Sequence, residues 1–251
     1  MSFNDKVVLV TGASSGIGAA IAIKFAEEGA KVAIVGRNQD KLSTVAAKCG
    51  KPLVLVADVT KDADCKRIVN ATIAQFGKLD VLINNAGIEG RASIKEEHAM
   101  QVFDQTMATN LRSVVYITHL AAQHVIKTKG NIINISSVAA IRAVAPNMFS
   151  YNVSKAGLDH FTRSVALEFA SDGVRVNSVN PGPVRTDIGK NAGISEAHSE
   201  IMWEMAKQVT ALKRVSEPVE VADLVLFLAS EKAKAITGAT YTTDNGMLLL
   251  H

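Results

Sequence analysis

Short apolar runs rich in β-branched residues alternate along the chain with longer segments of helical spacing. The runs are apolar almost continuously, which is typical of parallel strands covered by helices on both faces. We expect strands at 6–11, 31–36, 52–57, 80–84, 131–136, 174–179 and near 239–243, and helices at 17–29, 38–48, 61–76, 104–128, 151–171 and 218–230. Because parallel strands need crossover connections, this order predicts an α/β, Rossmann-type fold with a doubly wound, seven-stranded parallel sheet and helices on both faces.

The 251 residues are expected to form a single domain, 1–251, since α/β sheets of this size fold undivided and no repeat or linker interrupts the pattern. One segment departs from the alternation: residues 185–217 lie between two strand–helix units. In a compact domain, an insertion of this length usually covers a binding site. We therefore expect a substrate lid at about 188–215 that contributes Met202, Trp203 and Met205. A packed pair of surface helices is the alternative.

Composition argues against several classes of function. The formal net charge is only +3 and no Lys/Arg cluster is present, so a nucleic-acid partner is not expected. No apolar run is long enough to cross a membrane, and the N-terminus lacks the pattern of a secretory signal, so we expect a cytoplasmic protein. The two cysteines and six histidines show no ligand spacing, so neither a disulfide nor a metal site is expected.

A glycine-rich turn, TGASSGIG at 11–18, follows the first expected strand and opens the first helix. Gly12 permits a tight turn, Gly16 lets a pyrophosphate approach the backbone, and Gly18 lets the helix pack closely on the sheet. The free N–H groups of the helix N-terminus attract phosphate. Glycines can also simply end a strand, but their position between strand and helix favours a nucleotide site. The expected contacts of that nucleotide are these glycines with Ser14, Ser15 and Ile17.

The end of the second expected strand, Gly36-Arg37-Asn38, bears on the choice of cofactor. An acidic residue in this region commonly binds the ribose 2′-hydroxyl of NAD, but Gly36 offers no carboxylate. Arg37 could hold the 2′-phosphate of NADP through charge-assisted hydrogen bonds of about 1.5–3 kcal/mol each. We therefore expect NADP(H), contacted by Arg37 and Asn38. NAD(H), with Arg37 merely solvated, is the alternative.

Tyr151 and Lys155 lie four positions apart in SYNVSKAG at 150–157, a segment expected to be helical. That spacing places both side chains on one face of the helix. Free tyrosine has a pKa near 10, and a neighbouring ammonium group favours the phenolate. We therefore expect Lys155 to lower the pKa of Tyr151, which would then act as an acid or a base near neutral pH.

Several motifs follow one another in a fixed order: TGASSGIG, NNAG at 84–87, Asn110, SS at 136–137, YNVSK at 151–155 and NPGPVRT at 180–186. With them, the chain resembles the short-chain dehydrogenase/reductase family over nearly all of residues 5–246. The resemblance implies a catalytic set of Asn110, Ser137, Tyr151 and Lys155. Ser137 precedes Tyr151 by one position more than is usual in the family, and Ser136 would then be structural.

The resemblance also implies further cofactor contacts and an assembly. The contacts after the third, fourth and sixth strands are Asp58, Val59, Asn84, Asn85, Ala86, Gly87, Pro181, Gly182, Val184 and Thr186. Tyr151 and Lys155 would also contact the cofactor, Ser137 would bind the substrate oxygen, and Asn110 would perturb its helix and position a water beside Lys155. Members of the family usually pair the helices expected at 104–128 and 151–171, so a homodimer or homotetramer is expected.

The activity implied by the resemblance is hydride transfer between NADP(H) and a carbonyl or alcohol. The expected cleft walls at 88–94, 138–149 and 188–208 are mostly small and apolar, with Arg142 as a charged exception. They favour a hydrophobic small molecule such as a steroid, an isoprenoid, a fatty derivative or a xenobiotic carbonyl. Two alternatives stay open: a 3-oxoacyl-thioester reductase, which would need a basic patch for an acidic carrier, and a catalytically silent NADP-binding regulator.

Overall fold

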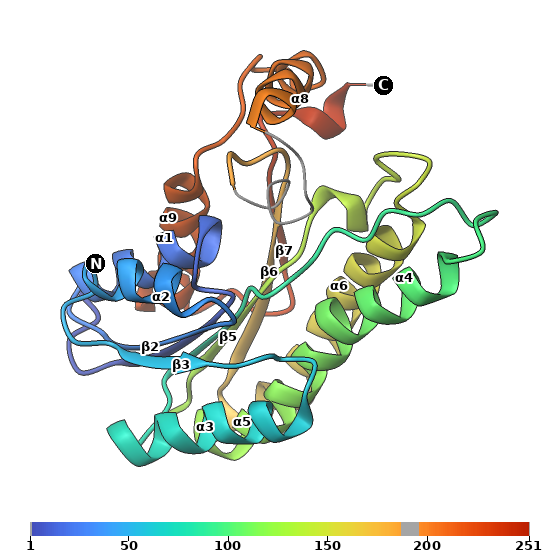
Figure 1. Ribbon diagram of the computed structural model, residues 1–251. Helices are drawn as coiled ribbons and strands as arrows, with labels where there is room; N and C mark the ends of the chain where they lie inside the picture. The colour runs from blue at the N-terminus through green and yellow to red at the C-terminus, as the bar shows by residue number, and fades with distance from the viewer. Residues whose placement is uncertain (1, 187–195, 251) are drawn as a thin grey trace.

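The computed structural model describes residues 2–186 and 196–250, and its centre is a twisted sheet of seven parallel strands (Figure 1). The strands are β1 Val7–Thr11, β2 Lys31–Gly36, β3 Leu53–Val56, β4 Val81–Asn84, β5 Asn131–Ile135, β6 Arg175–Pro181 and β7 Thr240–Thr243. Their order across the sheet is β3-β2-β1-β4-β5-β6-β7. The order reverses between β1 and β4, and ligands of open α/β sheets bind beyond the strand ends at such a point. The predicted Rossmann-type fold is confirmed.

Helices cover both faces of the sheet, which explains why strands such as β1 and β2 are almost entirely apolar. On one face lie α1 Gly16–Glu27, α2 Gln39–Ala46 and α9 Pro218–Ala229; on the other lie α3 Asp62–Phe76, α5 Ser113–Thr128 and α6 Phe149–Phe169. Within β1, Val8 and Val10 pack against the first group, and Val7 and Leu9 against the second. All four side chains are fully buried, so neither face of the strand needs polar residues.

The single helix expected at 104–128 is divided in the structure. It consists of α4 Ala99–Met107, a π-helical turn Ala108–Arg112 and then α5. The π turn is continuous with both helices, and Ser113 N–H bonds to the Ala108 carbonyl five residues earlier. Such turns insert one extra residue into a helix and often occur at functional sites. The local perturbation expected around Asn110 is therefore confirmed, and it takes the form of this turn.

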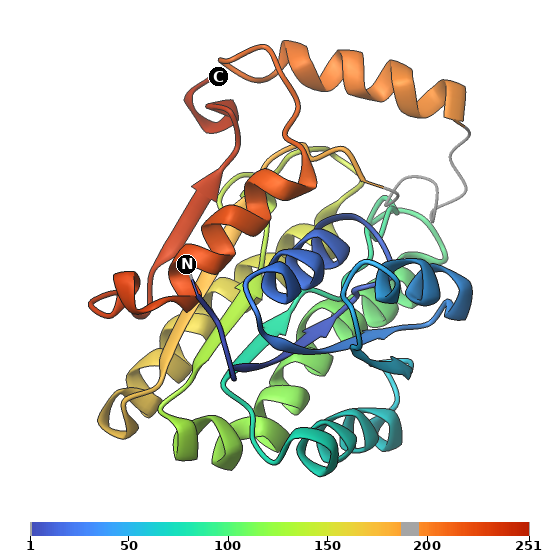
Figure 2. The same cartoon turned by 90° about the vertical axis from the view of Figure 1, so that its left-hand side faces the viewer.

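The inserted segment provides α8 Glu196–Gln208, which lies beyond the carboxyl ends of β6 and β7 (Figures 1 and 2). Residues 188–195 of the expected lid lie outside the described residues. The Arg185 guanidinium lies 5.9 Å from the ring centroid of Trp203 and 3.4 Å from a carboxylate oxygen of Glu200, and so ties α8 to the end of β6. Across residues 2–186 and 196–250, we find no helix with the length and apolarity that a membrane span requires.

Candidate active site

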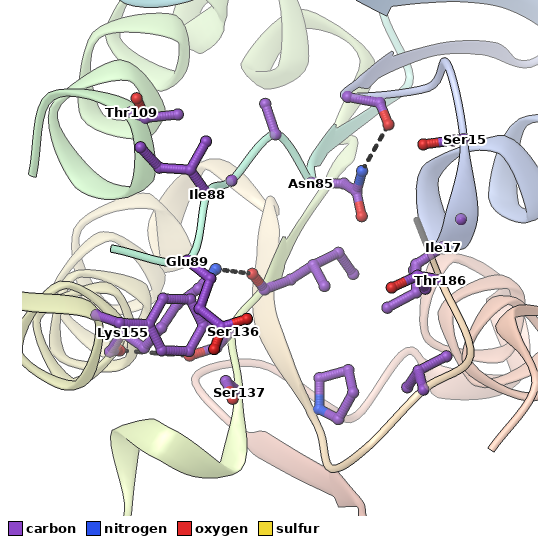
Figure 3. Close-up of a pocket in the computed structure, with 18 of the residues that line it drawn as sticks. Ser15, Ile17, Asn85, Ile88, Glu89, Thr109, Ser136, Ser137, Lys155 and Thr186 are labelled. Atoms are coloured by element: carbon purple, nitrogen blue, oxygen red, sulfur yellow. Dashed lines mark hydrogen bonds between the residues drawn. The ribbon is translucent and has the colours of Figure 1, made fainter. Parts of the chain in front are cut away.

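A cleft of about 860 Å³ opens at the carboxyl ends of the strands, around the point where the strand order reverses. The expected site residues that line it are Gly12, Ser14, Ser15, Gly16, Ile17, Arg37, Asp58, Val59, Asn85, Ala86, Gly87, Ser137, Tyr151, Lys155, Pro181, Gly182, Val184 and Thr186. Figure 3 shows Ser15, Ile17 and Thr186 on one side of this cleft, with Ser137 and Lys155 on the other. The fold thus brings residues from most of the sheet into one cavity.

The glycine-rich turn forms one end of the cleft, and at Gly12 and Gly16 there is little room for a side chain. Gly12 has φ +65°, and a Cβ there would lie 2.8 Å from the Ala86 Cα atom. Gly16 has φ +56°, and a Cβ there would lie 3.0 Å from Thr186 Cγ2. Ser15 precedes α1 in an extended conformation without a side-chain capping bond, so the first N–H groups of the helix stay available for an anion. This geometry fits the pyrophosphate of a dinucleotide.

Some of the expected residues support the cleft from outside it. A Cβ at Gly18 would lie 2.3 Å from the Gly12 carbonyl oxygen, so Gly18 serves the close packing of α1. The Asn38 side chain accepts a hydrogen bond from Lys41 N–H at 2.9 Å and caps α2. Asn84 is buried and donates to Asn134 Oδ1 at 2.9 Å, which joins β4 to β5. These three residues are absent from the cleft lining among the described residues.

Arg37 and Asp58 lie at the same end of the cleft, at the ends of β2 and β3. Burial acts to raise the pKa of Asp58, but hydrogen bonds from Thr60 N–H (3.0 Å) and Thr60 Oγ1 (2.8 Å), together with the charge of Arg37, bring this pKa below its usual value. Arg37 is exposed and forms neither an ion pair nor a hydrogen bond with the other described residues. Its guanidinium is therefore free to meet a ligand.

The opposite end of the cleft holds Ser137, Tyr151 and Lys155. Ser137 follows β5, and its side chain is hydrogen-bonded to Tyr151 and accepts Ala139 N–H at 3.1 Å. Tyr151 lies in the first turn of α6, where the Lys155 ammonium is 5.7 Å from its ring centroid. Lys155 is 4% exposed and donates to the Ile135 carbonyl oxygen at 2.8 Å. Ser136 also lines the cleft, and its Oγ donates to the Lys155 carbonyl oxygen at 3.3 Å.

The prediction that Lys155 makes the Tyr151 phenol acidic is wrong for the protein without ligand. Burial raises the pKa of Tyr151 to about 12, a hydrogen bond with Ser137 opposes the rise, and the charge of Glu89 adds to it. Burial also lowers the pKa of Lys155 to about 8, against the effect of Asp159. Loss of water disfavours both charged forms, and the ammonium is engaged by a backbone carbonyl. Residue spacing alone did not reveal this cost of burial.

Asn110 lies in the π turn, close to Lys155: a Cβ at Gly87 would come 3.4 Å from Asn110 Oδ1 and 3.6 Å from Lys155 Nζ. Its side chain is fully buried: Oδ1 accepts Ile88 N–H at 2.8 Å, and Nδ2 donates to the Ile88 carbonyl oxygen at 2.9 Å and to Ser154 Oγ at 3.1 Å. The side-chain oxygen and amide group of Asn110 thus both have protein partners, and Asn110 is not in the cleft lining among the described residues. Its observed contacts fix the loop after β4 against α6.

Glu89 and Arg91 were not singled out in the sequence, yet both line the cleft and form an ion pair. We call the part of the cleft around Ser137, Tyr151 and Lys155 its catalytic half, and assign this ion pair to it. Their position directly after NNAG was the available signal, since that segment was expected to reach the site. Asp159 was also overlooked. It is buried one turn beyond Lys155, and its Oδ2 accepts Asn180 Nδ2 at 2.7 Å. Asn180 also donates to the Ser137 carbonyl oxygen at 3.0 Å, so this pair holds Ser137 in place.

The remaining cleft walls match part of the expected segments. The apolar residues that line this half are Val138, Val144, Ala145, Met148, Met202, Trp203, Val209 and Met247. Met205 of α8 is exposed and is not among these lining residues, contrary to expectation. Met247 comes from the C-terminal turn, which the sequence pattern did not connect with the site. The catalytic half of the cleft therefore combines the Glu89–Arg91 ion pair with a wall of apolar side chains.

Comparisons with known proteins agree with this geometry. The profile of a family described as enoyl-(acyl carrier protein) reductase matches residues 12–248. The chain is 38% identical to glucose 1-dehydrogenase of Gluconobacter oxydans, over 98% of this chain and 93% of that protein. A short-chain dehydrogenase/reductase of unknown function from Caenorhabditis elegans, solved with cofactor, superposes with a TM-score of 0.95 at 33% identity and covers 99% of this chain and 97% of its own.

Levodione reductase superposes with a TM-score of 0.92 at 32% identity and covers 99% of this chain and 100% of its own. Fold, order of motifs and full-length similarity therefore agree, and the chain belongs to the short-chain dehydrogenase/reductase family of oxidoreductases.

Proposed function

We propose that this protein transfers a hydride between NADP(H) and the carbonyl or alcohol group of a small molecule. Ser137, Tyr151 and Lys155 lie at one end of the cleft, and the glycine-rich turn that fits a phosphate lies at the other. This arrangement is the observation that carries the proposal. Family membership supports the oxidoreductase class and a nicotinamide cofactor. The proposal of NADP as the cofactor rests on Arg37, and the proposed class of substrate rests on the residues of the cleft walls.

The residues of the cleft fit a nicotinamide dinucleotide, with Gly12 and Gly16 on its phosphates. Val184 and Thr186 would hold the nicotinamide carboxamide, and Lys155 lies at the reacting end. The bound nicotinamide supplies or accepts the hydride. Ser137 donates a hydrogen bond to the substrate oxygen and fixes it beside the phenol. Tyr151 gives a proton to that oxygen during reduction and takes it back during oxidation. The Ser137–Tyr151 hydrogen bond opposes the rise in the pKa of the phenol that burial causes.

The apolar wall favours a substrate with a hydrophobic skeleton, and α8 would act as its lid through Met202 and Trp203. Levodione reductase and glucose 1-dehydrogenase, two similar proteins, are named for a ketone and for a sugar. A 3-oxoacyl-thioester reductase is the second candidate, because the matching family is described by an acyl-carrier-protein reaction. A catalytically silent NADP-binding regulator is the third, and turnover itself excludes it.

The decisive experiment is a screen of carbonyls and alcohols, including acyl thioesters, with NADP(H) and NAD(H), followed by absorbance of the reduced cofactor. We expect turnover that Tyr151→Phe abolishes, because the phenylalanine ring offers no proton. The same variant should bind NADPH as the wild type does, measured by fluorescence titration. Undiminished turnover by Tyr151→Phe would refute the assignment.

Cofactor choice is tested by Arg37→Ala. Loss of a charge-assisted hydrogen bond to the 2′-phosphate, worth about 1.5–3 kcal/mol, should raise the KM for NADPH roughly tenfold to a hundredfold. The KM for NADH should change far less, since NADH has no 2′-phosphate. Lys41→Ala, which removes a cation from α2 outside the cleft lining, is the control. Equal changes for both cofactors in Arg37→Ala would remove the case for NADP.

A further inference from the structure

The backbone on both sides of Glu89 is fixed by neighbouring elements. Asn110 in the π turn bonds both the N–H and the carbonyl of Ile88, at 2.8 and 2.9 Å. The Gly90 carbonyl oxygen accepts a hydrogen bond from Ser150 Oγ of α6 at 3.3 Å. A Cβ at Gly90 would lie 2.0 Å from Thr106 Oγ1 of α4, so the chain passes close to this helix directly after Glu89. The fold therefore sets the direction in which the Glu89 side chain points.

That direction is into the catalytic half of the cleft. Glu89 lines the cavity, and Figure 3 shows it beside Ser136 and Lys155. Its side chain is 14% exposed, so most of its surface is already withdrawn from water. Glu89 and Tyr151 line the same cleft, and the charge of Glu89 acts to raise the pKa of the Tyr151 phenol. A substrate bound in this cleft can therefore contact the Glu89 carboxylate.

Arg91 limits which substrate groups can bind favourably to the Glu89 carboxylate. Its guanidinium pairs with the Glu89 carboxylate, lines the same cleft and is 40% exposed. The pair has no net charge, so a cationic substrate gains little there, and an anionic one would face the carboxylate. A carboxylate has about four lone-pair sites, and one guanidinium leaves acceptor sites unused. A neutral hydrogen-bond donor is the group that suits the remaining sites.

Resting on the proposed hydride transfer, we propose that Glu89 is a specificity-determining residue that accepts a hydrogen bond from a substrate hydroxyl next to the reacting carbon. The substrate class is then a vicinal diol, or the corresponding α-hydroxy carbonyl compound. The hydroxylated edge of the molecule faces Glu89, and its carbon skeleton lies against the apolar wall formed by Val138, Val144 and Met148.

The discrimination comes from desolvation. A simple ketone or alcohol that fills the cleft removes water from the Glu89 carboxylate and returns no donor, which costs binding free energy. A hydroxyl on the neighbouring carbon replaces the lost water. Sites built around a hydroxyl reject analogues that lack it. Since Glu89 is already paired with Arg91, we expect the diol to be favoured about 10- to 100-fold in kcat/KM.

The test compares oxidation of 1,2-cyclohexanediol and cyclohexanol, with NADP⁺ and NAD⁺, in the wild type, Glu89→Gln and Glu89→Ala. These two substrates differ by a single hydroxyl. Wild type should prefer the diol by at least about tenfold in kcat/KM, Glu89→Gln should reduce this preference about tenfold, and Glu89→Ala should abolish it. Glu97→Gln removes an exposed carboxylate outside the cleft lining and should leave the preference unchanged.

An equal preference in wild type and Glu89→Gln would overturn the inference while the hydride transfer itself stands. Faster turnover of 2-aminocyclohexanol than of the diol would also overturn it, because the carboxylate would then be selecting a cation. Absence of turnover with every alcohol and carbonyl of the screen, at the level of Tyr151→Phe, would show instead that the proposed function fails and takes the inference with it.

Discussion

Burial of the Lys155 ammonium carries an electrostatic cost in the folded protein, because it lowers the pKa of the amine. The Lys155 amine lies among buried groups, bonds one backbone carbonyl and has Asp159 as the acidic residue that opposes the fall of its pKa to about 8. The unfolded chain binds this proton more tightly, with a pKa near 10.4. Below pH 8 both states are protonated and the folded state bears the full cost. As pH rises from 8 toward 10.5 the cost disappears, so Lys155 makes stability increase with pH in that window.

Lys155→Met should therefore stabilise the cofactor-free protein. The pKa difference corresponds to about 3 kcal/mol, and the lost bond to Ile135 returns about 1 kcal/mol of it. We expect the free energy of unfolding in urea to rise by about 1–3 kcal/mol at pH 7, with the gain gone by pH 10.5. Lys95→Met, at an exposed position, should show no such pH dependence. A variant less stable than wild type at pH 7 would contradict the buried-charge account.

Among the secondary-structure elements, α1 packs closely against the glycine turn and the end of β4. Gly18 lies on its inner face, where a Cβ would come within 2.3 Å of both the Gly12 carbonyl oxygen and Asn85 Nδ2. Asn85 in turn bonds the carbonyls of Thr11 and Gly12, each at 3.0 Å. The turn, the helix and the end of β4 thus form one close-packed unit, and a methyl group at Gly18 would force them apart.

Gly18→Ala should destabilise the protein by about 1–3 kcal/mol, the range for overpacking in a rigid site, and should weaken NADPH binding as the turn shifts. Gly157→Ala in α6 is the matched control, because its Cβ would meet only the flexible end of Leu111 at 2.9 Å. There, the better helix propensity of alanine should keep the change within about 1 kcal/mol. Thermal unfolding and a cofactor titration measure both effects. Equal stability of the two variants would contradict the close-packing argument.

The ends of the helices separate what local sequence specifies from what packing specifies. Gly77 ends α3 in the left-handed conformation, and Gly173 does the same for the 3-10 turn Ala170–Asp172 that follows α6, as glycines after helices commonly do. At the end of α5 that conformation belongs to Lys129, and Gly130 instead lets the chain pass close to the Asp80 carbonyl, 2.4 Å from a hypothetical Cβ. For the π turn, the sequence likewise predicted only that the helix is perturbed near Asn110. The type of turn depends on contacts of Asn110 with Ile88 and Ser154, which lie outside this helix.

For the molecule as a whole, the outer faces of α5 and α6 are the surfaces expected to pair in an oligomer. Val115, Val153 and Leu167 are exposed there, Leu167 at 82%. If these helices form the interface, Leu167→Glu places a charge in an apolar contact and should shift the protein toward a smaller species in light scattering. Leu249→Glu, at an exposed leucine near the C-terminus, is the control. Unchanged mass in Leu167→Glu would place the interface elsewhere.

The sequence by itself determined the fold class, because apolar strands that alternate with helices can be buried only as a parallel sheet covered on both faces. It also determined the glycine turn and placed Tyr151 and Lys155 on one helical face, since both features depend on residue type and local spacing, whereas Ser137 was identified through the family resemblance. Tertiary structure alone decided the protonation of Tyr151 and Lys155, the enclosed position of Asn110 and the direction of Glu89. Each of these depends on how much water is removed, and on which groups are brought near, when segments far apart in the chain pack together.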